Sequence, residues 1–148
     1  MTYYAKSSQP DGAQETVRQH LQCVEILAKT YGRTFGAEIP AGLCGLFHDF
    51  GKYSAAFQKV LQGTQAGIDH AIGGAAFLYG FQKEYQKKAL CPIIEAVAAH
   101  HSHLVSREDL TGVLEAVLGT EGPVTTLCGK QAALCGEKEY QEAIMAFQ

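Results

Sequence analysis

Residues 46–52 read LFHDFGK, so a histidine and an aspartate stand side by side directly after an apolar run. Adjacent positions on a helix point about 100° apart, so His48 and Asp49 cannot both face a hydrophobic core in the usual way. Both could reach one ion at the end of that helix, because imidazole nitrogen and carboxylate oxygen together suit Zn, Fe, Mn, Ni or Co. For this pair alone, a solvated helix end at which His48 bonds to Asp49 is the more common explanation.

The other histidines change this interpretation. Residues 93–99 are apolar nearly all round, which predicts a central helix, and histidines follow at positions 100, 101 and 103. A buried helix that ends in three histidines within four residues has no common structural explanation. His20 by itself is more often a core histidine than a ligand. Taken together, however, five histidines and one aspartate form four groups on different expected helices: His20, His48-Asp49, His70 and His100-His101.

This set offers enough nitrogen ligands for two ions. Asp49 is the natural bridge, because a carboxylate has two oxygens and can bind an ion with each. Two ions roughly 3.5–4 Å apart can stabilise both the attacking and the leaving oxygen of a phosphodiester. The pattern therefore predicts hydrolytic cleavage of a phosphate ester. His103 has no place in it and is expected at the surface or behind a ligand.

The elements that must position these residues are all expected to be helices. Apolar residues recur at helical spacing from Glu15 to about Tyr31, and Gly32 is placed to end that helix. The residues of this stripe are Val17, Leu21, Val24, Leu27, Ala28 and Tyr31. Pro40 fits the first turn of a second helix, which leads into the His-Asp pair.

Later segments continue the helical pattern. Residues 53–61 are expected to be helical, and Asp69 is in N-cap position for a helix that carries His70 in its first turn. The small residues at positions 73–76 would let a neighbouring helix approach closely. Pro92 opens the central helix.

Ser106 and Asp109 form a capping box for a further helix through Val117. Beyond residue 119 the pattern weakens, and only residues 137–147 look helical again. With no alternating strand pattern, the fold class is all-α, and we expect a single domain over residues 1–148, with a core of 1–118 and a less certain helical tail of 119–148.

Composition sets limits on function. The formal net charge of −3 over 148 residues argues against a freestanding, strongly basic nucleic-acid binder. The chain shows no signal-peptide run and no stretch of ~20 apolar residues, so we expect a cytoplasmic protein without membrane contact. Its cysteines form no CxxC pair and are expected to be reduced and mostly buried: Cys23, Cys44, Cys91, Cys128 and Cys135.

The arrangement resembles the HD-domain metal-dependent phosphohydrolase superfamily, whose fold is a helical bundle with the metal site between helices. The segment HDFGK matches its signature. Single-metal members usually carry only the first histidine, the HD pair and a later aspartate, so the added His70 and His100-His101 resemble the two-metal branch. That branch includes the CRISPR-associated HD nucleases of type I interference and cyclic-dinucleotide phosphodiesterases with a Gly-Tyr-Pro motif.

Two features favour the CRISPR nucleases. Residues 4–7, Tyr-Ala-Lys-Ser, resemble the Ala-Lys-Ser segment of that nuclease domain, and no Gly-Tyr-Pro follows His101. The resemblance implies a nuclease for single-stranded DNA. Its partners would be a superfamily 2 helicase, fused or separate, and a guide-RNA surveillance complex. The alternative is an HD-type phosphohydrolase that acts on nucleotides or cyclic dinucleotides, and a third possibility is a non-catalytic domain that keeps the metal site.

The resemblance also implies roles for individual residues. It makes His20, His48 and Asp49 the ligands of one divalent ion, and Asp49, His70, His100 and His101 those of a second. Asp49 would be catalytic through its bridging position. Lys52 matches the family lysine near the site and could steady the scissile phosphate as a point charge. A helix-end cation that complements the helix dipole is an equally good explanation of Lys52.

One position departs from the family pattern. The superfamily closes the first metal site with an aspartate on a later helix, and only Asp109 follows His101 in this chain. Asp109 already has a structural explanation as a capping residue. The chain could therefore be a fragment of a longer nuclease-helicase, with a first metal site that is incomplete, weakly occupied and poorly active.

Overall fold

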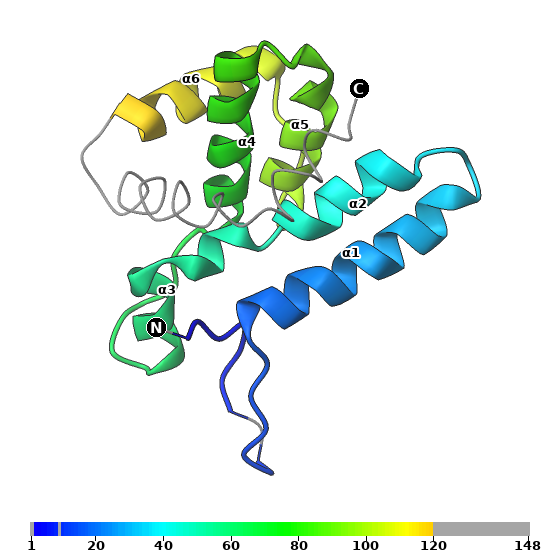
Figure 1. Ribbon diagram of the computed structural model, residues 1–148. Helices are drawn as coiled ribbons and strands as arrows, with labels where there is room; N and C mark the ends of the chain where they lie inside the picture. The colour runs from blue at the N-terminus through cyan, green and yellow to red at the C-terminus, as the bar shows by residue number, and fades with distance from the viewer. Residues whose placement is uncertain (1, 9, 120–148) are drawn as a thin grey trace.

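The computed structural model describes residues 2–8 and 10–119 of the chain (Figure 1). These residues form α-helices and two short 3-10 helices, and this part of the chain contains no strand beyond a single bridge between Tyr4 and Thr16. The predicted all-α fold is confirmed. In order, the elements are α1 (Val17–Arg33), α2 (Glu38–Phe47), η1 (Phe50–Tyr53), α3 (Ala55–Leu61), α4 (Ala71–Tyr85), η2 (Lys88–Leu90), α5 (Cys91–Ala99) and α6 (Arg107–Gly119).

Helix α1 begins at a capping box. The Thr16 hydroxyl accepts a hydrogen bond from the backbone N–H of Gln19, and the Gln19 side chain accepts one from the backbone N–H of Thr16. These bonds satisfy donors that a helix leaves free in its first turn. The helix therefore starts at Val17, later than predicted, and Glu15 precedes it.

Gly32 does not end α1, contrary to the prediction. The helix runs on to Arg33, and the left-handed position that follows belongs to Gly36, with a φ of 73°. A Cβ atom at Gly32 would lie 2.7 Å from the Ala37 carbonyl oxygen and 2.7 Å from the Cβ of Ala41. Gly32 is needed because α2 packs closely on α1, and this contact with a later segment has no signal within the helix itself.

Helices α1 and α2 form a hairpin whose connecting turn projects beyond the other helices (Figure 1). Val17 and Leu21, near the start of α1, are fully buried. Leu27 and Tyr31, predicted on the same apolar stripe, are 56% and 69% exposed. The stripe is therefore buried only in its first half, because the far half of α1 extends past the body of the molecule.

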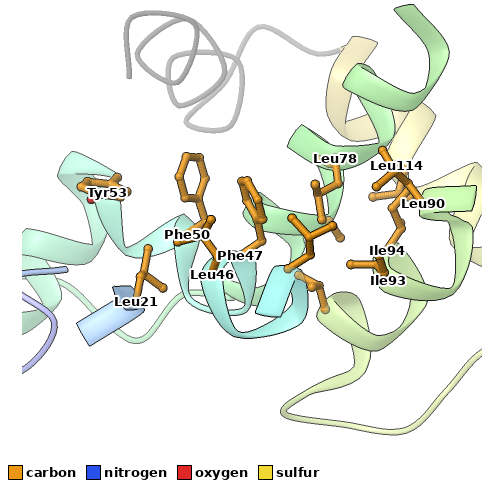
Figure 2. Packing of buried hydrophobic residues seen from close by; sticks show 14 of the residues in the cluster. Leu21, Leu46, Phe47, Phe50, Tyr53, Leu78, Leu90, Ile93, Ile94 and Leu114 are labelled. Carbon is orange, nitrogen blue, oxygen red and sulfur yellow. The ribbon is translucent and has the colours of Figure 1, made fainter. Parts of the chain in front are cut away.

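The core lies where α2 and η1 meet α4 and α5 (Figure 2). Phe47 and Phe50 are fully buried, and their ring centroids are 5.1 Å apart. Complete burial of such a side chain contributes about 1.5–3 kcal/mol to folding. A Cβ atom at Gly74 would overlap the carbonyl oxygen of Phe47. The close helix approach predicted for residues 73–76 is therefore present, and it holds the start of α4 against the end of α2.

Helix α5 is buried on one face only. Ile93, Ile94 and Val97 are buried, whereas Ala96 is exposed. The helix is central as predicted in that it contributes these three residues to the core, but it is not buried all round, because small apolar residues such as alanine do not report which side of a helix is covered. Pro92 lies in the first turn of α5, as predicted.

The cysteines are less buried than predicted. Cys23 is exposed, and Cys44 and Cys91 are half-buried. Cys23 is two positions after the buried Leu21, which turns it to the opposite side of α1. Cys128 and Cys135, like the predicted tail beyond residue 119, lie outside the described residues. Among the helices that the structure describes, none is long and apolar enough to cross a membrane.

Candidate metal centre

All six side chains that the sequence proposed as metal ligands lie together. They come from the first turn of α1, the junction of α2 and η1, the start of α4 and the end of α5, which meet in one region of the fold (Figure 1). They form two groups that share Asp49. We refer to His20, His48 and Asp49 as the His20 group, and to Asp49, His70, His100 and His101 as the His70 group.

The two carboxylate oxygens of Asp49 divide the histidines between them. Oδ2 lies 2.9 Å from Nε2 of His20 and 3.2 Å from Nε2 of His48. Oδ1 lies 3.1 Å from Nε2 of His70, 3.4 Å from that of His100 and 3.9 Å from that of His101. The histidines therefore surround Asp49 in the two groups that the sequence suggested.

These separations suit ligands of common ions. Two ligand atoms bound to one ion at about 2.0–2.2 Å lie roughly 3–3.5 Å apart. In addition, Nε2 of His70 and Nε2 of His101 are only 2.9 Å apart. In each group the ligand atoms all lie within 4.8 Å of one another, so either group could hold a divalent ion.

Hydrogen bonds to the backbone determine which ring nitrogen of His48 and of His100 faces the centre of the cluster. Nδ1 of His48 lies 2.8 Å from the Gly45 carbonyl oxygen, and Nδ1 of His100 lies 2.7 Å from that of Val97. A carbonyl can only accept, so Nδ1 donates in both rings, and Nε2, which faces Asp49, is the nitrogen left to bind an ion. Both histidines follow the last turn of a helix, where carbonyl oxygens have no partner within the helix.

His70 is positioned by two neighbouring residues. The Asp69 carboxylate accepts hydrogen bonds from the backbone N–H groups of Ala71, at 2.9 Å, and Ile72, at 3.3 Å. Asp69 therefore serves the start of α4, but the N-cap residue is His70, one position later than predicted, and His70 does not lie in the first turn of the helix. A Cβ atom at Gly51 would overlap the carbonyl of His70. Gly51 therefore allows the two ligand-bearing segments to come together.

Two buried atoms of the His70 group lack a hydrogen bond. Oδ1 of Asp49 and Nε2 of His100 are both buried, and no residue that the structure describes completes a hydrogen bond to either. Buried polar atoms without a partner are rare, because each costs about 1–3 kcal/mol. An ion between them would satisfy both, so these residues fit a divalent metal.

The charge of Asp49 is maintained by its neighbours. Burial alone favours the protonated acid, but contacts with His100, His48, His70 and Lys52 outweigh burial and hold the pKa of the Asp49 carboxyl far below its ordinary value. The effect on His100 is reciprocal. Burial disfavours the imidazolium, yet Asp49 and the Val97 carbonyl raise the pKa of His100. Asp49 is thus an ionised, accepting group at the middle of the cluster.

Lys52 lies at the site. Its Nζ is 2.7 Å from Oδ2 of Asp49, and its side chain is mostly buried over the ring of Phe57. The ammonium therefore faces the same oxygen as His20 and His48. This position suits a charge at the centre better than one that complements a helix dipole, since Lys52 belongs to a 3-10 helix of only four residues.

Asp109 and His103 do not join the cluster. The Ser106 hydroxyl accepts from the backbone N–H of Asp109 at 3.1 Å and donates to its carboxylate at 2.6 Å. Asp109 is an exposed capping residue, as one of its two explanations predicted, and no aspartate from residues 2–119 closes the His20 group. His103 is exposed and borders a separate depression of about 180 Å³ between α5 and α6.

Two residues near the site had no signal in the sequence. Glu15 lies between Lys6 and His20, with Oε2 3.0 Å from Nζ of Lys6 and 3.6 Å from Nδ1 of His20. Gln58 is 7% exposed and bonds to the backbone of both Tyr4 and Lys52. Glu15 precedes a helix and Gln58 lies within one, so neither shares a helical spacing with the residues it supports.

The fold and the ligand cluster together indicate a type of metal site. An all-helical fold with five histidines around one buried aspartate is consistent with an HD-type site. No protein-family model matches the chain, and no curated protein or solved structure is significantly similar to it.

Proposed function

We propose that the protein is a metal-dependent nuclease of the HD type that hydrolyses phosphodiester bonds of single-stranded DNA in CRISPR type I interference. The observation that carries the proposal is the division of the histidines between the two oxygens of Asp49. In this proposal the His20 group holds one divalent ion and the His70 group a second, drawn from Fe, Mn, Ni, Co and Zn. Such ions supply the Lewis acidity that activates water and stabilises charge on a phosphoryl group.

The residues of the chain have distinct parts in this proposal. Asp49 bridges the two groups and remains ionised because its neighbours lower its pKa. Nε2 of His48 and Nε2 of His100 are held toward the centre by the bonds that Nδ1 of each ring donates to the backbone. Lys52 would orient the scissile phosphate as a point charge. These parts match the roles that the family resemblance implies.

Access to the cluster favours an extended substrate. The Asp49 side chain is 5% exposed, whereas that of His101 is 60% exposed, so the cluster opens to solvent on the side of His101. A single strand could pass across such an open site, while a small nucleotide is usually enclosed by its enzyme. The net charge of −3 gives little general attraction for DNA. A superfamily 2 helicase and a guide-RNA surveillance complex are therefore proposed as the partners that deliver the strand.

The test is a cleavage assay on circular single-stranded DNA, with a cyclic dinucleotide and free nucleotides offered in parallel. Mn, Ni, Co and Fe are each supplied to the unaltered chain, to Asp49→Ala and to the control His103→Ala. We expect metal-dependent cleavage of the DNA by the unaltered chain and the control. Asp49→Ala should lose at least about 100-fold, because loss of a group behind a ligand already costs about 10–100-fold.

Three results would oppose the proposal. Equal rates with and without the Asp49 carboxylate would point to a contaminant. Hydrolysis of nucleotides or of the cyclic dinucleotide, but not of DNA, would select a small-molecule phosphohydrolase. Tight metal binding without hydrolysis of any substrate would select a non-catalytic domain.

A further inference from the structure

His20 lacks the support that fixes two other histidines of the cluster. His48 and His100 follow the last turn of a helix and donate from Nδ1 to a carbonyl three residues earlier. His20 lies in the first turns of α1, where the carbonyl oxygens are engaged by the N–H groups of the next turn. An acceptor for Nδ1 of His20 must therefore come from outside the helix.

Glu15 is placed to be that acceptor. Its Oε2 lies 3.6 Å from Nδ1 of His20, just beyond hydrogen-bond distance, while Nε2 of the same ring donates a hydrogen bond of 2.9 Å to Oδ2 of Asp49, where an ion of the His20 group would bind. Oε2 is buried and forms an ion pair with Lys6, but no residue of the described chain completes a hydrogen bond to it. When an ion takes Nε2, a small rotation of either side chain would let Nδ1 donate to this oxygen and hold the proton of the neutral ring there.

The N-terminal segment holds Glu15 in place. The backbone N–H of Ala5 donates to the Glu15 carbonyl at 2.9 Å, and the N–H of Val17 donates to the Tyr3 carbonyl at the same distance. This pairing brings Nζ of Lys6 to 3.0 Å from Oε2 of Glu15. Glu15 is thus held through both its backbone carbonyl and its side-chain carboxylate.

The same segment is also tied to the backbone near Asp49. The Gln58 side chain accepts from the backbone N–H of Tyr4 at 3.0 Å and donates to the Tyr4 carbonyl at 3.0 Å. It also donates to the Lys52 carbonyl at 3.1 Å. Buried Gln58 therefore joins Tyr4, and with it the N-terminal segment, to the segment that carries Asp49 and Lys52.

We propose that Glu15 is a positioning residue that keeps the proton of His20 on Nδ1 and leaves Nε2 to bind an ion. The ion pair with Lys6 holds the Glu15 carboxylate beside the ring. A carboxylate behind a histidine ligand fixes the orientation of the ring and raises its basicity, and loss of such a group typically lowers metal affinity 10–100-fold. The inference rests on the metal-binding part of the proposed function, and its tests do not use catalysis.

The test measures Zn²⁺ affinity by competition with a chelating dye and the ¹⁵N signals of the His20 ring by NMR. Glu15→Ala should weaken the ion of the His20 group about 10–100-fold and leave the ion of the His70 group unchanged. It should also remove the signature of an Nδ1-protonated His20. Glu15→Gln keeps an accepting oxygen and should retain that signature, with a smaller loss of affinity.

Glu25→Ala is the matched control. Glu25 lies within α1 and likewise pairs with a lysine, Lys29, at 2.6 Å, but it is not part of the cluster. This variant should leave both the affinities and the His20 signals unchanged, even if it lowers the melting temperature.

The possible failures can be told apart. If Glu15→Ala changes neither the affinity nor the His20 signals of a chain that binds two ions, the role of Glu15 is refuted and the proposed function stands. If Glu15→Ala and Glu15→Gln both abolish the ion of the His20 group, Glu15 is a ligand and not a positioning residue. If the unaltered chain binds no ion, both proposals fall.

Discussion

Asp49 is a buried carboxylate whose charge must be compensated by its neighbours. Transfer of an isolated charge out of water costs several kcal/mol, so a buried carboxylate normally has a full set of partners. In this protein Nζ of Lys52 lies 2.7 Å from Oδ2, the oxygen that also faces His20 and His48. The lysine therefore provides positive charge where an ion of the His20 group would bind. A metal ion bound by the His20 group would therefore compete with Lys52 for this oxygen.

Replacing Lys52 by methionine tests this competition. The variant keeps the apolar part of the side chain and removes the ammonium group. We expect ion binding at the His20 group to tighten about tenfold, because two positive charges no longer approach the same oxygen. Cleavage of single-stranded DNA should become slower, because the point charge for the phosphate is lost. Titration with Mn²⁺ measures the first effect, and affinity that is unchanged or weaker would contradict it.

Residue type and order were enough to propose the ligands, but not their supporting groups. Histidines and aspartates are recognisable because few other roles need so many of them at helix ends. Gln58 was missed because its partner Tyr4 is distant in the sequence, and Glu15 was missed because it stands outside the helix that carries His20. Asp109 had two possible roles in the sequence, and the hydroxyl of Ser106 is the partner that the structure gives it.

At the scale of elements, the site is built from helix ends held close by glycines. The helices themselves were predictable from periodicity, because that pattern depends on the local chain alone. The role of Gly32 and the one-sided burial of α5 were not predictable, because they depend on which helix packs against them. Gly51 is the clearest case, since its lack of a side chain allows the backbone of His70 to approach.

Gly51→Ala should therefore harm both stability and metal binding. The added Cβ would overlap the His70 carbonyl, so one backbone segment must move. Overpacking of this kind typically costs about 1–3 kcal/mol. We expect a lower urea midpoint and weaker ion binding by the His70 group.

Gly80→Ala provides the control for this experiment. Gly80 lies within α4, and a Cβ atom there meets no heavy atom within 4 Å among the described residues. The exchange should leave metal binding unchanged and raise stability by up to about 1 kcal/mol, since alanine favours a helix. Equal urea midpoints and equal metal affinities for the two variants would show that the contact between Gly51 and His70 is not needed.

At the scale of the whole molecule, the cluster joins segments that are distant in sequence. His20 is the first ligand in the sequence and His101 is the last. The ligands come from the ends of four helices, α1, α2, α4 and α5. An ion that binds only the folded chain stabilises the whole fold by mass action. Metal binding and global stability should therefore be coupled.

Thermal unfolding measures this coupling. At a free Mn²⁺ concentration 100 times the dissociation constant, one site should raise the free energy of unfolding by about 2.7 kcal/mol. Asp49→Ala should unfold at the same temperature with and without Mn²⁺, whereas His103→Ala should be stabilised as fully as the unaltered chain. A shift of equal size in the Asp49 variant would place the ion elsewhere.

The most direct test of the central claim is the number of Mn²⁺ ions bound per chain, measured by equilibrium dialysis of the unaltered protein and Asp49→Ala side by side. We predict two ions for the unaltered chain. The tighter one belongs to the four residues of the His70 group, and the weaker one to the three residues of the His20 group. Asp49→Ala, with its helical circular dichroism retained, should bind neither. An unaltered chain that binds no ion, or an Asp49 variant that binds as many, would contradict the account.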